Sequence, residues 1–517
     1  MNQTVSDYRF KFSVVTAVYN VEPYLAEAIE SILAQDIGFE ESVEIILIDD
    51  GSTDRSGAIC DEYQQKFPDN IKVIHKENGG AASARNIGIS HCEGQYISFM
   101  DADDRLTSST LSDVYGFFST CDANIPFVSV PIYFFEKRDF GHRLNYKYEC
   151  ENSRIIDLAH EYSFVQMSAS SAFFRHKIIQ DRSFDTTLKY AEDAKLIMDI
   201  LLDCPRYGIV PSGRYMYRTR NALDSALNVS KHRKEWYIDS LKYYTFWALD
   251  ESERRLGYVP DFVQYTIMYD LLARFRMKKF PDDVMTAHEK ESFLSMLFRA
   301  LQRIDDHIVI EQHNLSPELC DYLLSIKKAP DSGTLVYDAD AENQYFHYSD
   351  FNSCSSASYP IFLETLDFQE NALTLQAHVK IYTRFPYPSK MFLRLISGSQ
   401  TQIIDCSFYE NRDKGALFNG QQLSLTLYFT AVIPYDMLKS STKVEFCMIS
   451  GSNTIKFHSF RRGNEFPVTP ENSRFKSGKR VFYVTLASQS LNFEPGTPVA
   501  GLKHKAMHCA RVIRRHI

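Results

Sequence analysis

Apolar and polar positions in the N-terminal part of the chain alternate in blocks that are typical of an α/β fold. Continuous apolar runs at residues 12–18, 45–48 and 96–100 predict strands that are buried on both faces. Apolar residues recur at helical spacing over residues 25–33, and residues 56–67 repeat this pattern. The order of strand, helix, strand and helix therefore predicts an α/β sheet covered by helices.

Acidic residues directly follow two of the predicted strands. The turn at residues 49–54 (DDGSTD) follows the second strand, and residues 101–104 (DADD) follow the third. Carboxylates at the ends of parallel strands can hold a nucleotide and the metal that neutralises its phosphates. No Gly-x-Gly-x-x-Gly follows the first strand and the chain has no Gly-Lys-Ser/Thr loop. A Mg²⁺ or Mn²⁺ ion held by Asp101 and Asp103 is therefore the expected partner of the phosphates.

Four segments together resemble the family 2 glycosyltransferases with the GT-A fold. They are residues 15–20 (VTAVYN), 49–54 (DDGSTD), 78–88 (NGGAASARNIG) and 99–104 (FMDADD). Four motifs in the right order within about ninety residues are far more specific than any one of them. The resemblance implies a GT-A (Rossmann-like) catalytic domain at residues 1–228 that takes a sugar from a nucleotide-sugar donor, with a UDP-sugar expected.

The resemblance also implies roles for individual residues. It assigns nucleotide-sugar binding to Ala17, Tyr19, Asp50, Arg85 and Asp101, and metal binding to Asp103 and Asp101. Asp50 would accept a hydrogen bond from the nucleotide base, and a carboxylate is a strong acceptor for a uracil imide N–H. Asp49 and Asp54 are interpreted instead as turn or helix-cap residues. Asp104 is a second metal candidate, or a cap for a helix starting near Ser108.

An acidic pair begins a later helical run. Glu192 and Asp193 precede apolar residues at helical spacing, and similar enzymes place the catalytic base at the second acid of such a pair. The resemblance therefore implies that Asp193, beside Glu192, deprotonates the acceptor hydroxyl, and one base with direct displacement predicts inversion of configuration. The alternative is that both acids only complement the helix dipole.

Residues 215–220 (YMYRTR) and the following Ser225 resemble the strand and loop that cover the diphosphate in this family. Arg218 or Arg220 could pair with phosphate oxygens, because a guanidinium forms paired charge-assisted hydrogen bonds. Arg220 and Ser225 are our candidates for this contact. Surface strand positions are the alternative interpretation.

The rest of the chain predicts two further regions and a tail. Residues 229–332 are expected to form a helical linker, because residues 260–277 are apolar around most of a helix. This region is similar to the linker of bacterial wall teichoic acid and capsule glycosyltransferases. Alternating strands over residues 333–490 predict an antiparallel β-sandwich, interpreted as a glycan-binding or homo-oligomerisation module. Residues 491–517 form a basic tail.

Composition limits the partners and the compartment. A net charge of -9 argues against a nucleic-acid partner, and ten cysteines without metal or disulfide spacing indicate reduced thiols. A polar N-terminus and the lack of a long apolar run predict a cytoplasmic protein. The basic tail could bind the inner face of the cell membrane, end in solvent, or begin a further domain.

These observations predict an inverting, metal-dependent glycosyltransferase. The expected acceptor is a hydroxyl of a cell-surface polysaccharide or of a teichoic-acid-like polyol-phosphate polymer. Two alternatives stay open. The chain could be the glycosyl half of a bifunctional polymerase, or a catalytically silent glycan-binding scaffold, which predicts loss of an acidic residue although Asp101, Asp103 and Asp193 are all present.

Overall fold

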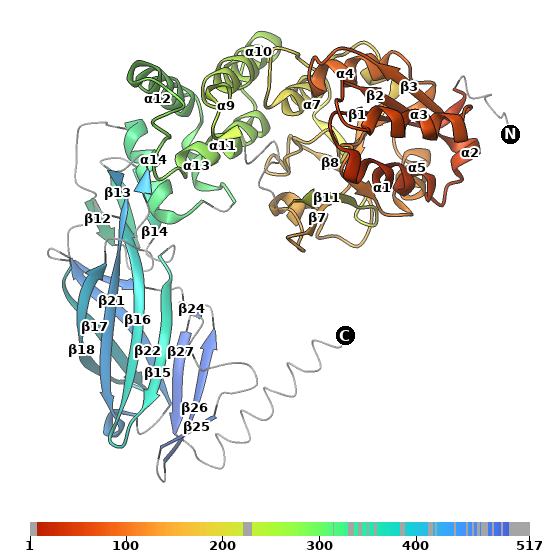
Figure 1. The fold of residues 1–517 in the computed structure, drawn as a ribbon. Helices are drawn as coiled ribbons and strands as arrows, with labels where there is room; N and C mark the ends of the chain where they lie inside the picture. The colour runs from red at the N-terminus through yellow and green to blue at the C-terminus, as the bar shows by residue number, and fades with distance from the viewer. Residues whose placement is uncertain are drawn as a thin grey trace. The chain divides into compact units, whose positions relative to one another are not determined.

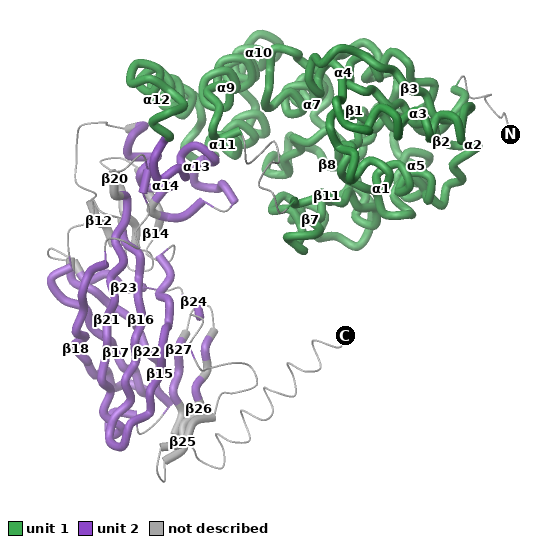
Figure 2. Tube along the Cα trace, in the orientation of Figure 1, with its two compact units in different colours: residues 1–271, 281–308 green, residues 272–280, 309–517 purple. Residues whose placement is uncertain are grey.

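The computed structural model describes residues 8–220, 230–313 and 315–328, and most of the chain from 336 to 495 with short gaps (Figure 1). The chain divides into two compact units (Figure 2). Unit 1 contains residues 1–271 and 281–308, and unit 2 contains residues 272–280 and 309–517. The boundaries expected at residues 228, 332 and 490 stay predictions. Ser225 and residues 496–517 of the basic tail lie outside the described residues.

Unit 1 is built on an eight-stranded mixed sheet. Its strand order is β3 (Ile71–His75), β2 (Val43–Asp49), β1 (Phe10–Val18), β4 (Gly94–Phe99), β9 (Ala172–Arg175), β6 (Phe127–Ser129), β10 (Arg206–Ile209) and β8 (Arg154–Asp157). The first four strands are parallel, and β9 and β8 run antiparallel to their neighbours. The three strands predicted from the apolar runs are thereby confirmed.

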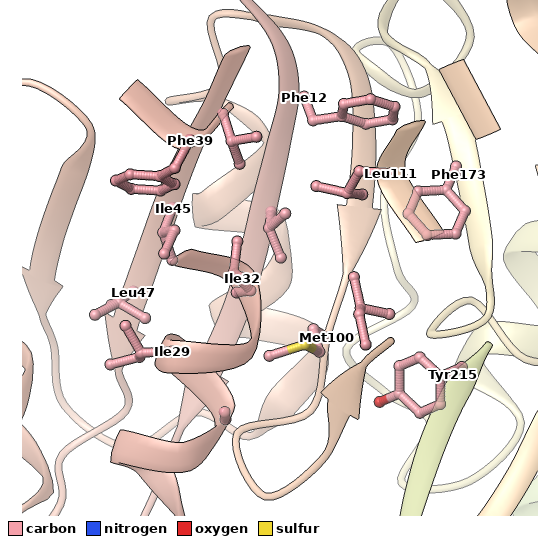
Figure 3. Packing of buried hydrophobic residues seen from close by; sticks show 14 of the residues in the cluster. Phe12, Ile29, Ile32, Phe39, Ile45, Leu47, Met100, Leu111, Phe173 and Tyr215 are labelled. Atoms are coloured by element: carbon pink, nitrogen blue, oxygen red, sulfur yellow. The ribbon is translucent and has the colours of Figure 1, made fainter. Parts of the chain in front are cut away.

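Helices flank this sheet and bury their apolar side chains against it (Figure 3). They are α1 (Glu22–Leu33), α2 (Phe39–Ser42), α3 (Ser56–Lys66), α4 (Ala81–Ile89), α5 (Thr110–Thr120), α6 (His176–Ile179) and α7 (Glu192–Asp203). Ile32 of α1 joins Ile45 and Leu47 of β2 in one fully buried cluster. Burying one such side chain contributes about 1.5–3 kcal/mol. The helices predicted at residues 25–33 and 56–67 are confirmed as α1 and α3.

A second, three-stranded sheet joins distant parts of the sequence. Its order is β5 (Arg105–Leu106), β11 (Tyr215–Thr219) and β7 (Ile132–Glu136). Tyr215 pairs with Leu106 and Met216 with Arg105, so β11 lies beside the chain that follows the DADD turn. The short helix η1 (Arg143–Tyr148) completes the elements before α6.

The helical region predicted after the α/β domain is confirmed. It contains α9 (Lys234–Tyr237), η2 (Leu241–Thr245), α10 (Phe246–Leu256), α11 (Asp261–Phe275), α12 (Ala287–Gln302), α13 (Asp306–Ile310) and α14 (Pro317–Lys328). Val263, Ile267, Met268 and Leu271 of α11 are fully buried, as its all-round apolar pattern predicts. None of the described helices combines the length and the hydropathy that crossing a membrane requires.

Most of unit 2 is antiparallel sheet. A small sheet contains β12 (Val336–Ala339), β13 (Gln344–Tyr348) and β14 (Phe351–Ser355), and β19 (Leu417–Phe418) pairs with β20 (Gln421–Gln422). The main sheet has eleven strands, in the order β24 (Phe460–Arg462), β15 (Ile361–Phe368), β16 (Ala372–Tyr382), β21 (Ser424–Pro434), β18 (Gln400–Asn411), β17 (Pro388–Ser397), β22 (Thr442–Ser450), β27 (Ser490–Pro495), β26 (Arg480–Ala487) and β25 (Arg474–Ser477), with β23 (Asn453–Phe457) beside β22.

The long strand β18 connects the two halves of this sheet. Its first part, as far as Cys406, pairs with β17, and its second part, from Ser407, pairs with β21. The halves pack face to face, because the rings of Phe429 on β21 and Phe446 on β22 have centroids 5.6 Å apart. The predicted antiparallel sandwich is confirmed in this form.

Candidate functional site

The candidate site lies at the carboxyl ends of the parallel strands. The backbone N–H of Asp50 donates to the carbonyl of Val18 at 2.8 Å, so Asp50 lies beside the end of β1. β4 pairs with β1 on its other side and leads into Asp101. Ala17 lies in β1 and the half-exposed Tyr19 follows it. The register of three strands therefore brings these four predicted donor-site residues to one edge.

Asp50 is buried and organises the loop that leads into α4. One carboxylate oxygen accepts hydrogen bonds from Lys76 Nζ at 2.5 Å and from the N–H of Gly79 at 2.9 Å. The other oxygen accepts from the N–H of Gly80 at 2.7 Å. Gly80 precedes α4 with a φ of 86°, which favours glycine. Asp50 thus fixes the segment from which Arg85 projects.

Arg85 connects residues from three parts of the sequence. Its buried guanidinium, on α4, donates to Asp101 at 2.8 Å, to Asp193 at 3.0 Å and to Glu192 at 3.2 Å. Burial disfavours the charged guanidinium, but the three carboxylates together raise the pKa of Arg85. The arginine therefore stays charged at any ordinary pH, and it neutralises only part of the acidic charge around it.

The acidic pair at the start of α7 faces this arginine. Asp193 also accepts a hydrogen bond from the backbone N–H of Ala169 at 2.9 Å. Burial raises the pKa of Asp193, although Arg85 and the N–H of Ala169 oppose the increase. Burial and the neighbouring Asp193 raise the pKa of Glu192 to about 7. Both acids are therefore better proton acceptors than exposed carboxylates.

Asp103 faces a second arginine. Arg220 donates to one oxygen of Asp103 through Nε at 3.0 Å and through a terminal nitrogen at 2.5 Å. Burial and the charge of Asp101 raise the pKa of Asp103, while Arg220 lowers it. In this structure the predicted phosphate-binding arginine therefore pairs with the predicted metal ligand.

Asp104 is a structural residue in this arrangement. The hydroxyl of Tyr215 donates to Asp104 at 2.7 Å and accepts from the N–H of Asp101 at 3.2 Å, and the N–H of Arg218 donates to Asp104 at 2.7 Å. The expected helix-cap role is wrong, because α5 begins after Ser109 and Asp104 points to β11 instead. Pairing of β11 with β5 explains this, since it brings Tyr215 beside the turn.

Arg218, the alternative phosphate candidate, is enclosed by protein. Its side chain is buried, forms ion pairs with Glu27 and Glu136, and donates to the carbonyl of Asp103 at 2.6 Å. Arg218 is therefore committed to positioning the DADD turn. Arg220, which directly follows β11, is the better phosphate candidate.

The carboxylates of the DADD turn fit a divalent cation. The contacts of the described residues leave one oxygen of Asp101 and one of Asp103 without a hydrogen bond, while Asp104 uses both of its oxygens. No group of three or more potential ligands is assembled among the described residues. A pair of carboxylates matches Mg²⁺ or Mn²⁺ sites in which substrate phosphates and water supply the other ligands.

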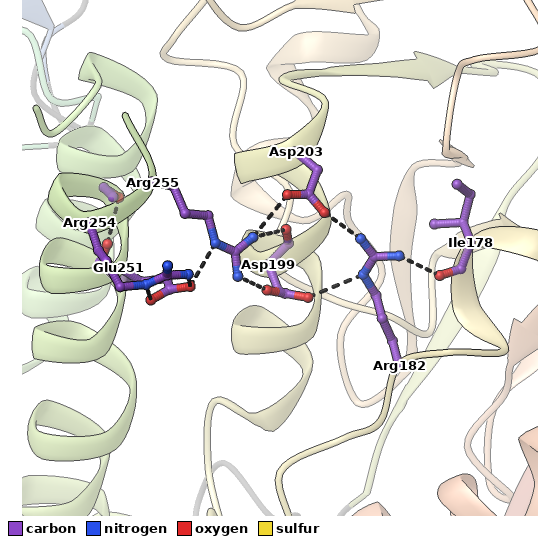
Figure 4. A network of polar contacts seen from close by, with 9 residues as sticks. Ile178, Arg182, Asp199, Asp203, Glu251, Arg254 and Arg255 are labelled. Carbon is purple, nitrogen blue, oxygen red and sulfur yellow. Dashed lines mark hydrogen bonds and ion pairs between the residues drawn. The ribbon is translucent and has the colours of Figure 1, made fainter. Parts of the chain in front are cut away.

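An ion-pair network holds α7 in place behind the site (Figure 4). Arg182 donates to Asp199 at 3.1 Å and to Asp203 at 2.5 Å, and from the other side Arg255 of α10 contacts the same two carboxylates at 2.5 and 3.0 Å. Arg255 also contacts Glu251 at 2.6 Å. Alternating charges between α10 and α7 thus fix the helix that begins with the acidic pair.

The sequence interpretation missed Lys76 and Tyr215, which hold Asp50 and Asp104. A lysine two residues before the NGG segment was the available signal for the first. The tyrosine had no local signal, because its partners are more than a hundred residues away in sequence. Ser225 cannot be placed with the other candidates, as it lies outside the described residues.

Comparison with known proteins relates the whole arrangement to glycosyltransferases. Residues 13–182 match the family model described as glycosyl transferase family 2. GgaB of Bacillus subtilis (strain 168), named a minor teichoic acid biosynthesis protein, is 32% identical over 445 residues, which are 86% of this chain and 49% of GgaB. The chain thus spans about half the length of that relative. GgaA of the same strain, also named a minor teichoic acid biosynthesis protein, is 34% identical over 308 residues, which are 58% of this chain and 68% of GgaA.

One solved structure resembles the chain over most of its length. The crystal structure of Staphylococcus aureus TarS has a TM-score of 0.62 at 17% sequence identity, covering 95% of this chain and 86% of that chain. TarS is named a poly(ribitol-phosphate) beta-N-acetylglucosaminyltransferase. In the sequence comparison it is 25% identical over 236 residues, which are 45% of this chain and 39% of TarS. The structural likeness concerns the fold.

Proposed function

Because the chain belongs to glycosyltransferase family 2, we propose that it transfers a sugar from a UDP-sugar to a hydroxyl of a teichoic-acid-like polyol-phosphate polymer. The acceptor class is supported by relatives named for teichoic acid biosynthesis or for modification of poly(ribitol phosphate). The cytoplasmic location and a membrane contact through the basic tail are part of this proposal.

The convergence on Arg85 carries the proposal. Residues that follow β4 and begin α7 meet at one guanidinium, although Asp101 and Asp193 are far apart in sequence. A donor site at the strand ends and a base at the start of α7 would therefore lie within one arginine's reach of each other. Such closeness is what a direct displacement requires.

Each group has a defined task in this proposal. Ala17 and Tyr19 flank the nucleotide base, and Asp50 accepts a hydrogen bond from its imide N–H while holding the loop before α4. Arg220 pairs with the diphosphate. A divalent cation bound by Asp101 and Asp103 would neutralise the charge on the leaving diphosphate.

Asp193 takes the proton from the acceptor hydroxyl. Its raised pKa favours this task, and the Ala169 N–H and Arg85 hold the carboxylate in a fixed orientation. Attack from the side opposite the leaving diphosphate inverts the configuration at the anomeric carbon. Glu192, with its pKa raised to about 7, can take up a proton near neutral pH and so reduce the negative charge beside Asp193.

Nucleotide release tests the proposal directly. The full chain is incubated with Mn²⁺, a polyol-phosphate polymer and a panel of UDP-, GDP- and CDP-sugars. We expect release of UDP, loss of transfer and of metal-dependent donor binding in Asp103→Ala, and unchanged turnover in the exposed control Asp69→Asn. The scaffold alternative requires that no donor is turned over, whereas the bifunctional alternative is consistent with GgaB being about twice the matched length.

A further inference from the structure

One face of the main sheet in unit 2 carries a row of rings across four adjacent strands. In order they are Phe362 on β15, His378 on β16, Tyr428 on β21 and Tyr409 on β18, and each is the register partner of the next. Neighbouring ring centroids are 4.8, 5.2 and 5.3 Å apart. The planes of Tyr428 and Tyr409 differ by only 13°, so the two rings stack. The row is a continuous aromatic platform.

A hollow of about 640 Å³ lies on this platform. Besides His378, Tyr428 and Tyr409, its lining includes polar residues one row away on either side, because alternate residues of a strand share a face. Gln376 and Thr430 lie in the row on one side. Lys380 and Thr426 lie in the row on the other side. Hydroxyl, amide and ammonium groups therefore border an aromatic surface.

This combination suits a sugar. A pyranose ring has one apolar C–H face, which packs on an aromatic ring, and an edge of hydroxyls that need hydrogen-bond partners. The lining is not dominated by one charge, since His378 lies 2.7 Å from Glu364 and Lys380 adds a single ammonium group. These residues therefore do not form the cluster of cations that a purely anionic ligand would require.

A purely structural role explains only part of the row. Cross-strand ring pairs stabilise sheets, and this accounts for the partly buried Phe362, His378 and Tyr428. It gives no reason for the row to end in Tyr409, whose side chain is 62% exposed beside the hollow. The exposed ring of Tyr409, stacked with that of Tyr428, offers a surface on which a ligand ring can stack.

We propose that this face binds the sugar substituents of a glycosylated polyol-phosphate chain, with a pyranose ring on the Tyr409 and Tyr428 pair. Lys380, one row away, supplies a cation for a backbone phosphate. The identity of the polymer rests on the proposed function, whereas the sugar-binding chemistry rests on the platform itself. The face would then hold the growing product rather than the nucleotide donor.

Calorimetric titration of the full chain tests this site. The probes are poly(ribitol phosphate) bearing β-N-acetylglucosamine and the same polymer without sugar. We expect the glycosylated polymer to bind more tightly, Tyr409→Ala to weaken that binding at least tenfold, and Tyr409→Phe to keep it within twofold. Ile403→Ala is the matched control, because Ile403 is 57% exposed on the same strand but outside the hollow; it should bind like the parent chain.

Two outcomes would overturn the inference. One is equal affinity of the parent for both polymers. The other is parent-like polymer affinity in Tyr409→Ala; if sedimentation of this variant also shows altered self-association, the face serves contacts between copies of the chain.

The same preparations separate this site from the proposed function. If the chain releases UDP but Tyr409→Ala binds polymer normally, the sugar-binding site is wrong and the proposed function stands. If polymer binding depends on Tyr409 but no nucleotide sugar is turned over, the proposed function is wrong and the binding site stands.

Discussion

The two units present polar chemistry in opposite ways. In unit 1 most residues of the strands β1, β2 and β4 are buried, and the acidic residues of the candidate site lie directly after the strands, at Asp50 and Asp101. In unit 2 the antiparallel sheet has a solvent-facing side, and polar groups line the middle of the strands around Tyr409. The parallel sheet of unit 1 therefore places its charged site at the ends of the strands, whereas the antiparallel sheet of unit 2 spreads polar and aromatic groups over one face. The first suits chemistry on a phosphorylated donor, and the second suits retention of a long chain.

The largest expected effect concerns the base of unit 1. Asp193→Asn should lower transfer by about 10²–10⁴-fold, because general-base catalysis contributes that much, while UDP binding stays close to that of the parent. Initial rates of UDP release and the affinity for UDP measure the two effects separately. Transfer at the parent rate would show that another group takes the proton.

The ion pairs of Arg85 should contribute strongly to the stability of unit 1. Arg85→Met leaves Asp101, Glu192 and Asp193 without their shared cation, and removing one partner of a buried ion pair costs about 3–5 kcal/mol. Urea unfolding of the parent and the variant gives the difference. Arg55→Met, which removes an exposed arginine paired at 3.4 Å with Glu62, should change stability by less than about 0.5 kcal/mol.

A buried lysine should make the stability of unit 1 depend on pH. Burial lowers the pKa of Lys147 to about 7. The unfolded chain keeps this proton until about pH 10.4, so it binds more protons between these values, and the contribution of Lys147 to stability should rise with pH from 7 to 10 by up to a few kcal/mol. Unfolding across that range, compared with Lys147→Met, checks this. A variant with the same slope as the parent would exclude Lys147 as the cause.

The smallest effect should belong to the aromatic face of unit 2. Tyr409→Ala is expected to change the free energy of unfolding by no more than about 1 kcal/mol, because the ring is exposed and contributes one cross-strand pair. Thermal unfolding measures it. A loss of several kcal/mol would mean that the row of rings stabilises the sheet and has no need of a ligand.

The two units also differ in how much of each site could be predicted from the sequence. The residues of the candidate site stand in short motifs because one turn follows each strand, so the sequence predicts Asp50, Asp101 and Asp103 together with the strands that precede them. The partners Tyr215 and Ala169 could not be found, since they reach the site through the pairing of β11 with β5 and the loop before β9. The platform of unit 2 takes one ring from each of four strands, so no stretch of sequence records it. It becomes visible only when the register is known.

The charge network between α7 and α10 bears on how this protein can be truncated for study. A fragment that stops at residue 228 would discard Arg255 and leave Asp199 and Asp203 with Arg182 alone, so the helix beginning with the acidic pair would lose its ion pairs to α10. Unit 1 continues through residues 281–308. The shortest truncation that keeps the proposed activity should therefore retain the helices as far as residue 308, which makes that segment a structural part of unit 1 rather than a spacer.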